Sequence, residues 1–288
     1  MVQKNDNVEN RNFMVLNVGF ARTLHHWGLR DLSSPFARIY YVVEGTAVLH
    51  LASGDVECRP GFMYLIPSFM PHSMDCEPGF KIYYLFVFER FQEHADIFEE
   101  RDFPIETRAN EAADLLFRNF CLLYPNLSLP YDDAAAFDAH LSYKHYAESY
   151  AAMESYEHLQ LQGLVWIIFS YFMKHSRPKY EVTDERLLRI AGYVQQHIAR
   201  EISTDALADI ACVSKSQLTR LFNQTFGVSP LQYVIRKKIQ HAQKLLLTTG
   251  YSVVQVSRSV GFADVSYFIR LFKKNIGFTP QDYRVKLK

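Results

Sequence analysis

The sequence contains little cysteine and no long hydrophobic run. Its four cysteines are scattered and form no CxxC pair; they are Cys58, Cys76, Cys121 and Cys212. A structural zinc site or a disulfide framework is therefore not expected. The most apolar stretch, Leu164–Phe172, is far too short to cross a bilayer and indicates a buried helix. The polar residues 1–10 lack the apolar core of a signal peptide. We therefore expect a cytoplasmic protein without a membrane partner.

The chain also lacks net charge, because its 31 Lys and Arg balance its 31 Asp and Glu. This balance hides an uneven distribution. Residues 1–180 carry 15 Lys and Arg against 23 Asp and Glu, a net charge of −8. Residues 181–288 carry 16 against 8, a net charge of +8. A basic C-terminal part indicates a polyanionic partner for that part alone.

The region from residue 36 to residue 89 has the pattern of short strands. Four segments are rich in Val, Ile, Tyr and Phe and are separated by glycine-containing turns: Ile39–Val43, Ala47–Leu51, Phe62–Ile66 and Lys81–Phe88. Strands at such short spacing predict a small antiparallel β-barrel or sandwich.

Helical periodicity begins near Thr107. Beyond the segment at 112–120, further helices are predicted at about 134–149 and 153–175, and Pro178 in the following linker ends the last of them. The predicted fold class is α+β, a small N-terminal barrel with following helices and a C-terminal all-α domain of seven helices. We place the barrel domain at 1–105, a helical connector or dimerisation region at 106–176, the linker at 177–183 and the all-α domain at 184–288.

The C-terminal helices have well-defined start and stop signals. They are predicted at about 184–200, 204–211, 214–226, 230–248, 252–259, 264–276 and 280–286. Ser214 with Gln217, and Ser229 with Gln232, have the spacing of capping boxes. Pro230 and Pro280 stand at first helical positions, where no N–H is needed. A left-handed cap is expected at three glycines, Gly227, Gly250 and Gly277.

An internal repeat organises this region. Residues 213–233 and 263–283, aligned at an offset of 50, share seven identities in 21 positions, including Arg220 with Arg270 and Gly227 with Gly277. Each copy completes a short helix, a tight turn and a longer helix, at about 204–226 and 252–276. This is the helix-turn-helix arrangement, in which the second helix enters the major groove of DNA.

The outward faces of the two second helices are polar and contain no acid. We predict DNA contacts at Lys215, Ser216, Gln217, Thr219, Arg220, Asn223, Ser266, Tyr267, Arg270, Lys273 and Lys274. The two arginines are suited to bidentate contacts with guanine, and the lysines to phosphate contacts. Between the two units, residues 229–248 form one amphipathic helix. Eighteen such residues span about 27 Å, so this helix could hold the two recognition helices near one DNA turn apart. Arg236, Lys237 and Lys238 add positive charge beside it.

Residues 184–288 resemble the DNA-binding domain of the AraC/XylS family of bacterial regulators. The resemblance is carried by Val260–Lys274, VGFADVSYFIRLFKK, and continues through Gly277-Phe278-Thr279-Pro280 and Tyr283-Arg284. It implies promoter binding through two helix-turn-helix motifs and, usually, activation through RNA polymerase. The family's base-contacting positions correspond to Ser216, Thr219, Arg220, Ser266, Tyr267 and Arg270.

Residues 36–89 are similar to the cupin-like sensor barrel of the same family, through Glu44-Gly45, Arg59-Pro60-Gly61, Ile66-Pro67 and Pro71-His72. Enzymatic cupins hold a metal with several His and Glu ligands. Here only His72 stands at a ligand-like position, and one imidazole cannot hold a catalytic metal. No metal or other cofactor is therefore expected. The barrel is better suited to a buried small molecule, such as a sugar or an aromatic acid. Candidate contacts to it are Arg38, Tyr40, His72, Tyr83 and Tyr84.

Three functions remain open at this point. The first is a regulator, not an enzyme, that binds double-stranded promoter DNA under control of a small-molecule effector. The second is a regulator whose barrel serves only dimerisation, and the third is a cupin enzyme fused to a DNA-binding module. A homodimer is expected, with the helices at 134–149 and 153–175 as its candidate interface, although their apolar stripe is equally expected of core packing.

Overall fold

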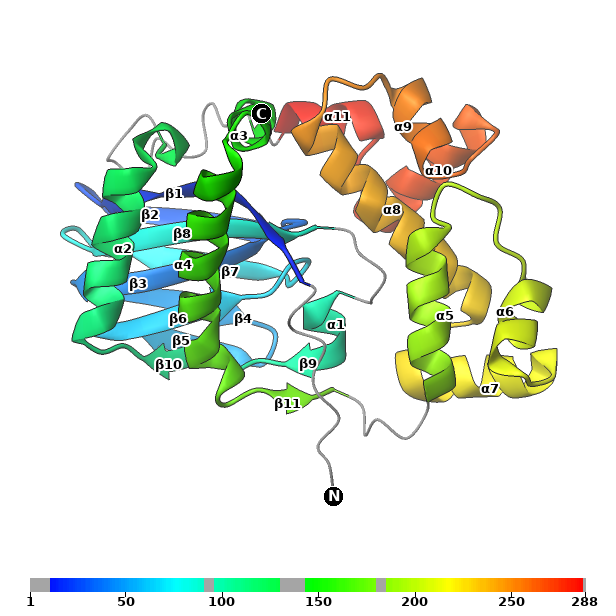
Figure 1. The fold of residues 1–288 in the computed structure, drawn as a ribbon. Coiled ribbons are helices and arrows are strands. Elements are labelled where there is room, and N and C mark those ends of the chain that lie inside the picture. Colours follow the sequence, from blue (N-terminus) through cyan, green and yellow to red (C-terminus); the bar gives the residue numbers. More distant parts are fainter. Residues whose placement is uncertain (1–10, 91–95, 130–142, 180–184, 287–288) are drawn as a thin grey trace. The chain divides into compact units, whose positions relative to one another are not determined.

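The computed structural model describes residues 11–90, 96–129, 143–179 and 185–286 (Figure 1). The chain divides into two compact units, one made of residues 1–90 and 102–177, the other of residues 91–101 and 178–288. This division differs from the predicted domains in two ways. Residues 91–101 group with the second unit rather than with the barrel, and the predicted helical connector packs within the first unit.

The first unit contains two antiparallel sheets that face each other. The five-stranded sheet has the order β1-β8-β3-β6-β10, and the four-stranded sheet has the order β2-β7-β4-β5. The strands of the first sheet are β1 (Phe13–Arg22), β3 (Ala37–Glu44), β6 (Phe62–Ile66), β8 (Lys81–Glu89) and β10 (Glu106–Arg108). Those of the second are β2 (Trp27–Leu32), β4 (Ala47–Leu51), β5 (Gly54–Cys58) and β7 (His72–Cys76). Two short strands, β9 (Arg101–Asp102) and β11 (Arg177–Pro178), lie where the chain passes between units.

Helices cover the outer face of the five-stranded sheet (Figure 1). They are α2 (Glu111–Leu123), α3 (Tyr143–Ala151) and α4 (Ser155–Met173), with the 3₁₀ turn Pro125–Leu127 between α2 and α3. Phe117 of α2 stacks on Tyr41 and Tyr83, with ring centroids 5.6 and 5.8 Å apart. Most of the apolar stripe of α4 is buried and belongs to the core of this unit: Leu161, Val165, Ile168, Phe169 and Phe172. Residues 134–142 of a predicted helix lie outside the described residues. Among the described helices, none is long and apolar enough to cross a membrane.

The four predicted strands correspond to β3, β4, β6 and β8, but the first strand begins at Phe13, before the region in which strands were predicted. The strands that sequence reasoning missed are β1, β2, β5 and β7, together with the short strands β9, β10 and β11. Two of them are polar at alternate positions: β5 has the sequence GDVEC and β7 the sequence HSMDC. In β7 the residues His72, Met74 and Cys76 are buried while the two between them are not. Such strands are stabilised by pairing with their neighbours, which a local hydrophobicity pattern does not report.

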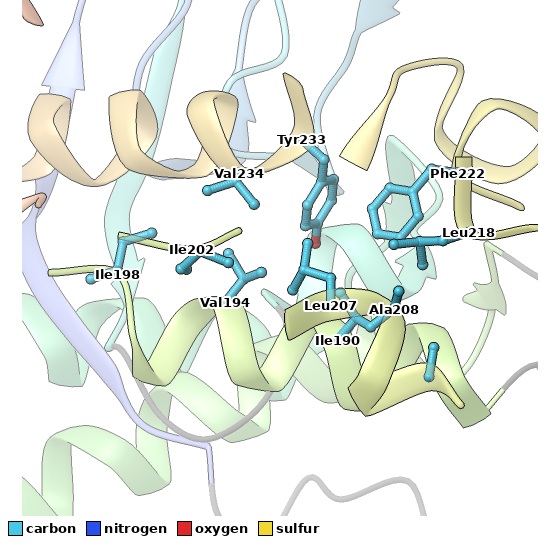
Figure 2. Close-up of a cluster of buried hydrophobic side chains, with 11 residues drawn as sticks. Ile190, Val194, Ile198, Ile202, Leu207, Ala208, Leu218, Phe222, Tyr233 and Val234 are labelled. Atoms are coloured by element: carbon cyan, nitrogen blue, oxygen red, sulfur yellow. The ribbon is translucent and has the colours of Figure 1, made fainter. Parts of the chain in front are cut away.

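The second unit contains, within residues 185–286, the seven helices that the sequence predicts. They are α5 (Glu185–Gln196), α6 (Thr204–Ala211), α7 (Lys215–Phe226), α8 (Pro230–Thr248), α9 (Val253–Ser259), α10 (Val265–Ile276) and α11 (Pro280–Lys286). The short helix α1 (Ile97–Glu100) also belongs to this unit. Figure 2 shows how apolar side chains of α5, α6 and α7 point toward Tyr233 and Val234 at the start of α8. Around the second helix pair, Phe272 packs edge-on against Phe268 and Tyr283.

Local capping signals account for most of the helix ends. Both predicted capping boxes form, and a third, Ser252 with Gln255, starts α9. Gly227 and Gly277 have φ angles of +67° and +86°, as expected of left-handed caps. The prediction for Gly250 is wrong, because α8 ends at Thr248 and its cap, Thr249, is extended. Thr248 and Thr249 instead donate their hydroxyls to the carbonyls of Lys244 and Leu245. The Leu246 carbonyl, which a glycine motif would cover, accepts the Nε–H of Arg284 at 3.0 Å.

This difference between the glycines is testable. Gly227→Ala should destabilise the protein by about 1–2 kcal/mol, because a left-handed residue with a Cβ is strained even where there is space for it. Gly250→Ala should have a smaller effect, since Gly250 does not have a positive φ. The measurement is thermal denaturation followed by the helical circular-dichroism signal. Equal losses in the two variants would contradict this assignment of the caps.

Candidate nucleic-acid interface and barrel interior

Two helix-turn-helix units are present in the second unit of the chain. In the first, α6 ends at Cys212, which has a left-handed φ of 53°, and α7 starts at the Ser214 cap. In the second, the turn contains Gly261 with a φ of +72°, and Asp264 caps α10 by accepting bonds from two backbone N–H groups. The same four-residue spacing buries Leu218 and Phe222 in α7, and Phe268 and Phe272 in α10. The two longer helices therefore present equivalent faces outward.

The outward face of α7 carries the predicted contact residues. Arg220 and Asn223 are exposed, as are Lys215, Ser216 and Gln217, while Thr219 is half-buried. An open depression of about 710 Å³ is lined by α7 residues alone. One helix cannot enclose a ligand, so this region is an exposed polar surface rather than a pocket.

Three of these α7 side chains already have local partners. Gln217 accepts bonds from the backbone N–H and hydroxyl of Ser214, at 3.0 and 3.1 Å. Thr219 donates its hydroxyl to the carbonyl of Lys215, at 2.9 Å. The ammonium of Lys215 lies 2.5 Å from Asp205 of α6, in an ion pair with both side chains exposed. Exposed pairs contribute about 0–1 kcal/mol, so this lysine can exchange its partner for a phosphate.

The outward face of α10 is equivalent. Ser266, Tyr267, Arg270, Lys273 and Lys274 are all exposed, and the ring of Tyr267 lies edge-on to Phe262. Arg270 occupies the position of Arg220 in the other copy. Lys273 and Lys274 stand in the last turn of α10, where positive charge complements the helix dipole.

Two of the three basic side chains that were expected to add positive charge beside α8 are buried. Lys237 and Lys238 of α8 are only 8% and 4% exposed, so neither adds to an open basic surface. Lys237 pairs with Glu99 of α1 within the second unit. Sequence periodicity alone does not distinguish these side chains from solvated lysines, because lysines usually occupy the exposed face of such a helix.

Four of the five candidate effector residues lie in the five-stranded sheet, where they divide between its two faces, and His72 lies in the four-stranded sheet. In the β3–β8 register Arg38 is opposite Phe86, and Tyr40 is opposite Tyr84. Directly opposed residues of antiparallel strands point to the same face, and successive residues alternate. Tyr83 therefore points away from the barrel interior, toward Phe117 of α2. Its inclusion beside Tyr84 is wrong, because adjacent strand residues cannot share one face.

The barrel interior contains a buried cation between aromatic rings. The guanidinium carbon of Arg38 lies 5.0 and 4.7 Å from the ring centroids of Phe36 and Phe86. Arg38 donates to the hydroxyl of Ser34 at 2.9 Å and to that of Tyr40 at 3.4 Å. Burial raises the pKa of Tyr40, with Arg38 opposing the shift. Tyr84 instead has a structural contact, since its hydroxyl accepts the backbone N–H of Leu129 at 2.8 Å.

Two further interior residues have polar atoms without a partner among the residues that the structure describes. His72 of β7 is buried, and burial together with Arg38 lowers its pKa to about 4. The neutral ring is therefore positioned to donate from Nδ1 to the carbonyl of Met70, 2.9 Å away, which leaves Nε2 as an acceptor without a partner. Asn17 of β1 is fully buried, and neither amide atom has a partner. It is opposite Phe86, on the face of Arg38.

Sequence reasoning missed Asn17. The available signal is a single amide within an otherwise apolar strand, FMVLNVGF. Among the described residues, no group of three or more His, Cys, Asp and Glu side chains is arranged to hold a metal ion.

Each of the two parts of the chain matches a known family. Residues 19–144 match the family described as AraC-like ligand binding domain, and residues 207–286 match a helix-turn-helix domain. The arabinose operon regulatory protein of Escherichia coli K12 is 36% identical over 102 residues, which are 35% of each chain. The transcriptional activator RhaS of Escherichia fergusonii is 34% identical over 104 residues, 36% of this chain and 37% of that protein. The matched region thus spans about a third of these relatives' length.

A solved structure resembles the fold over the whole chain. The crystal structure of fatty-acid-bound ToxT from Vibrio cholerae has a TM-score of 0.51 and 15% identity, and the likeness covers 100% of this chain and 98% of that one. A barrel of the ligand-binding type is thus followed by two helix-turn-helix units with the family's sequence pattern. The chain belongs to the AraC/XylS family.

Proposed function

We propose that this protein is a sequence-specific transcription regulator that binds promoter DNA through α7 and α10. The observation that carries the proposal is the repeated exposure of Arg220 and Arg270 at equivalent positions of two capped helices. A guanidinium can bond both acceptors of a guanine in the major groove, which discriminates by about 1–3 kcal/mol per contact. The remaining exposed side chains of the two helices are neutral or basic, as a polyanion requires.

Base contacts are proposed for Ser216, Thr219, Arg220, Ser266, Tyr267 and Arg270. Phosphate contacts are proposed for Lys215, Lys273 and Lys274, with Gln217 and Asn223 beside them. The single helix α8 supports this arrangement, because its 19 residues join the two helix-turn-helix units without a break.

We propose that the protein activates transcription through RNA polymerase. The relative RhaS is a transcriptional activator. A homodimer is also proposed. Large apolar side chains are exposed on α2 and α4, notably Leu122 at 77% and Leu159 at 75%. A second copy of the chain would remove these side chains from water.

We further propose that the barrel interior binds a small polar effector, such as a sugar or an aromatic acid. Its donors are Arg38 and the amide of Asn17, its open acceptor is Nε2 of His72, and its aromatic walls are Phe36 and Phe86. Buried polar atoms without partners carry a free-energy cost that a ligand's hydroxyl or carboxylate groups would remove. A barrel that serves only dimerisation has no such use for them.

Loss of either recognition arginine should remove sequence discrimination. Arg220→Ala and Arg270→Ala are each expected to lower the ratio of specific to random-duplex affinity about 10-fold to 100-fold. Fluorescence anisotropy with a duplex selected by the wild-type protein from a random pool provides the measurement. Arg189→Ala removes an exposed arginine from α5 and is the matched control. Unchanged discrimination in both α7 and α10 variants would refute the assignment of these helices.

Loss of a phosphate contact should act on all sequences alike. Lys273→Ala is expected to weaken specific and random duplexes similarly and to lower the slope of log affinity against log salt by about one. Lys144→Ala removes an exposed lysine of α3 and should leave the slope unchanged. A change in discrimination without a change in slope would place Lys273 at a base instead.

The effector proposal is tested by thermal shift against aldopentoses, aldohexoses and aromatic carboxylic acids. A ligand at 100 times its dissociation constant should stabilise the barrel by about 2.7 kcal/mol. Arg38→Met should abolish this shift, and Tyr83→Phe, on the outer face, should retain it. If no ligand stabilises the protein, the dimerisation scaffold is favoured. Stoichiometric iron, zinc or manganese in the purified protein would favour the enzyme alternative.

A further inference from the structure

The ammonium of Lys238 is bound inside the second unit by three backbone carbonyls. Lys238 lies in the middle of α8, and its side chain is buried. Its Nζ donates to the carbonyl of Arg200 at 2.7 Å, to that of Val260 at 2.9 Å and to that of Gly261 at 3.2 Å. The ring centroid of Phe262 lies 5.3 Å from the same nitrogen. An ammonium has three N–H donors, so these bonds use all of them.

The three carbonyls belong to different halves of the DNA-binding unit. Arg200 lies in the segment between α5 and α6, and thus next to the first helix-turn-helix. Val260 and Gly261 form the turn between α9 and α10, within the second helix-turn-helix. A single side chain therefore binds both halves, from the helix that connects them.

The backbone around Gly261 is closely packed. Gly261 has a φ of +72°, and a Cβ built there would lie 2.5 Å from Nζ of Lys238 and 2.7 Å from the carbonyl carbon of Ala199. The turn between α9 and α10 thus packs directly against the segment before α6. The Lys238 ammonium lies where these two backbone segments meet. The carbonyls of Val260 and Gly261 depend on the lysine for these bonds, and loss of a donor from a buried acceptor is costly.

The electrostatics agree with this geometry. Burial lowers the pKa of Lys238 to about 8, with Glu201 acting in the opposite direction. Three carbonyl oxygens and an aromatic face together replace part of the water that a cation loses on burial. The ammonium therefore holds the two halves together by directional bonds, whereas an apolar side chain would only fill the space.

We propose that Lys238 is a positioning residue that sets the orientation of α10 relative to α7, so that both recognition helices bind one DNA duplex at the same time. The proposal rests on the proposed function. Two linked binding modules gain affinity from each other only when their geometry allows both to engage, and this gain can exceed 100-fold. Lys238 itself needs no contact with DNA.

The test separates orientation from stability by using two duplexes. The full-length protein first selects a duplex from a random-sequence pool, and a second duplex has the half-site of α10 scrambled. For the wild type, scrambling should weaken binding about 100-fold. For Lys238→Met, the affinity for the intact duplex should fall about 10-fold or more, while the affinity for the scrambled duplex should stay within about twofold.

Lys237→Met is the matched control, because it removes one charge from the neighbouring residue without touching the three carbonyls. The Lys237→Met protein should keep the full gain in affinity that the half-site of α10 provides. A Lys238→Met protein that also keeps this gain would overturn the proposal. A parallel loss on both duplexes would overturn it too, because it would assign Lys238 a general role in stability.

A measurement on the wild-type protein covers the case in which Lys238→Met does not fold. Nitrogen-15 NMR should detect a slowly exchanging ammonium signal, assigned through its loss in Lys238→Arg. Rapid exchange of this ammonium with water would contradict the three contacts and with them the proposal. If the wild type selects no common sequence, the proposed function fails, and the NMR signal still decides whether the ammonium is bound as described.

Discussion

The DNA-binding unit depends on the burial of α8 between two helix pairs. Near its start, Tyr233 packs against Phe222 and Phe226 of α7. Toward its end, the Gln243 side chain donates to the hydroxyl of Tyr283 at 3.0 Å, next to the aromatic group around α10. One rigid helix thus contributes to both cores, and the outward direction of each recognition helix follows from how its apolar stripe packs on that helix.

The barrel differs from the DNA-binding unit because it buries polar groups in its interior. Its walls are apolar, and its interior has an arginine, a neutral histidine and an asparagine on two facing sheets. Polar groups in such a place lower stability unless their bonds are satisfied. Arg38 compensates for part of this loss through the rings of Phe36 and Phe86, whereas Asn17 and His72 have no such compensation among the described residues. The DNA-binding face differs, because its polar groups remain in water until a partner displaces it.

Sequence reasoning was accurate where structure is set locally. Six of the seven helices within residues 185–286 were predicted to within one residue at each end, because Ser214, Ser229 and Pro280 act on backbone groups within one turn. The helix α5 ends four residues before its predicted end, and α1 was not predicted. The strands β5 and β7 were missed because their stability comes from pairing across the sheet. The helix end at Gly250 was assigned to the wrong residue, since the carbonyl that a glycine cap would serve, that of Leu246, accepts a bond from the distant Arg284.

For the candidate sites, the sequence by itself determined that two copies of one polar helix exist and that Arg220 and Arg270 occupy equivalent places. Both conclusions follow from helical periodicity and an internal repeat. Only the tertiary structure decided that Tyr84 rather than Tyr83 shares the face of Arg38, that Asn17 lies in the barrel interior, and that Lys238 is buried among carbonyls. These facts depend on which strands and helices meet, and that information is spread over residues far apart in the chain.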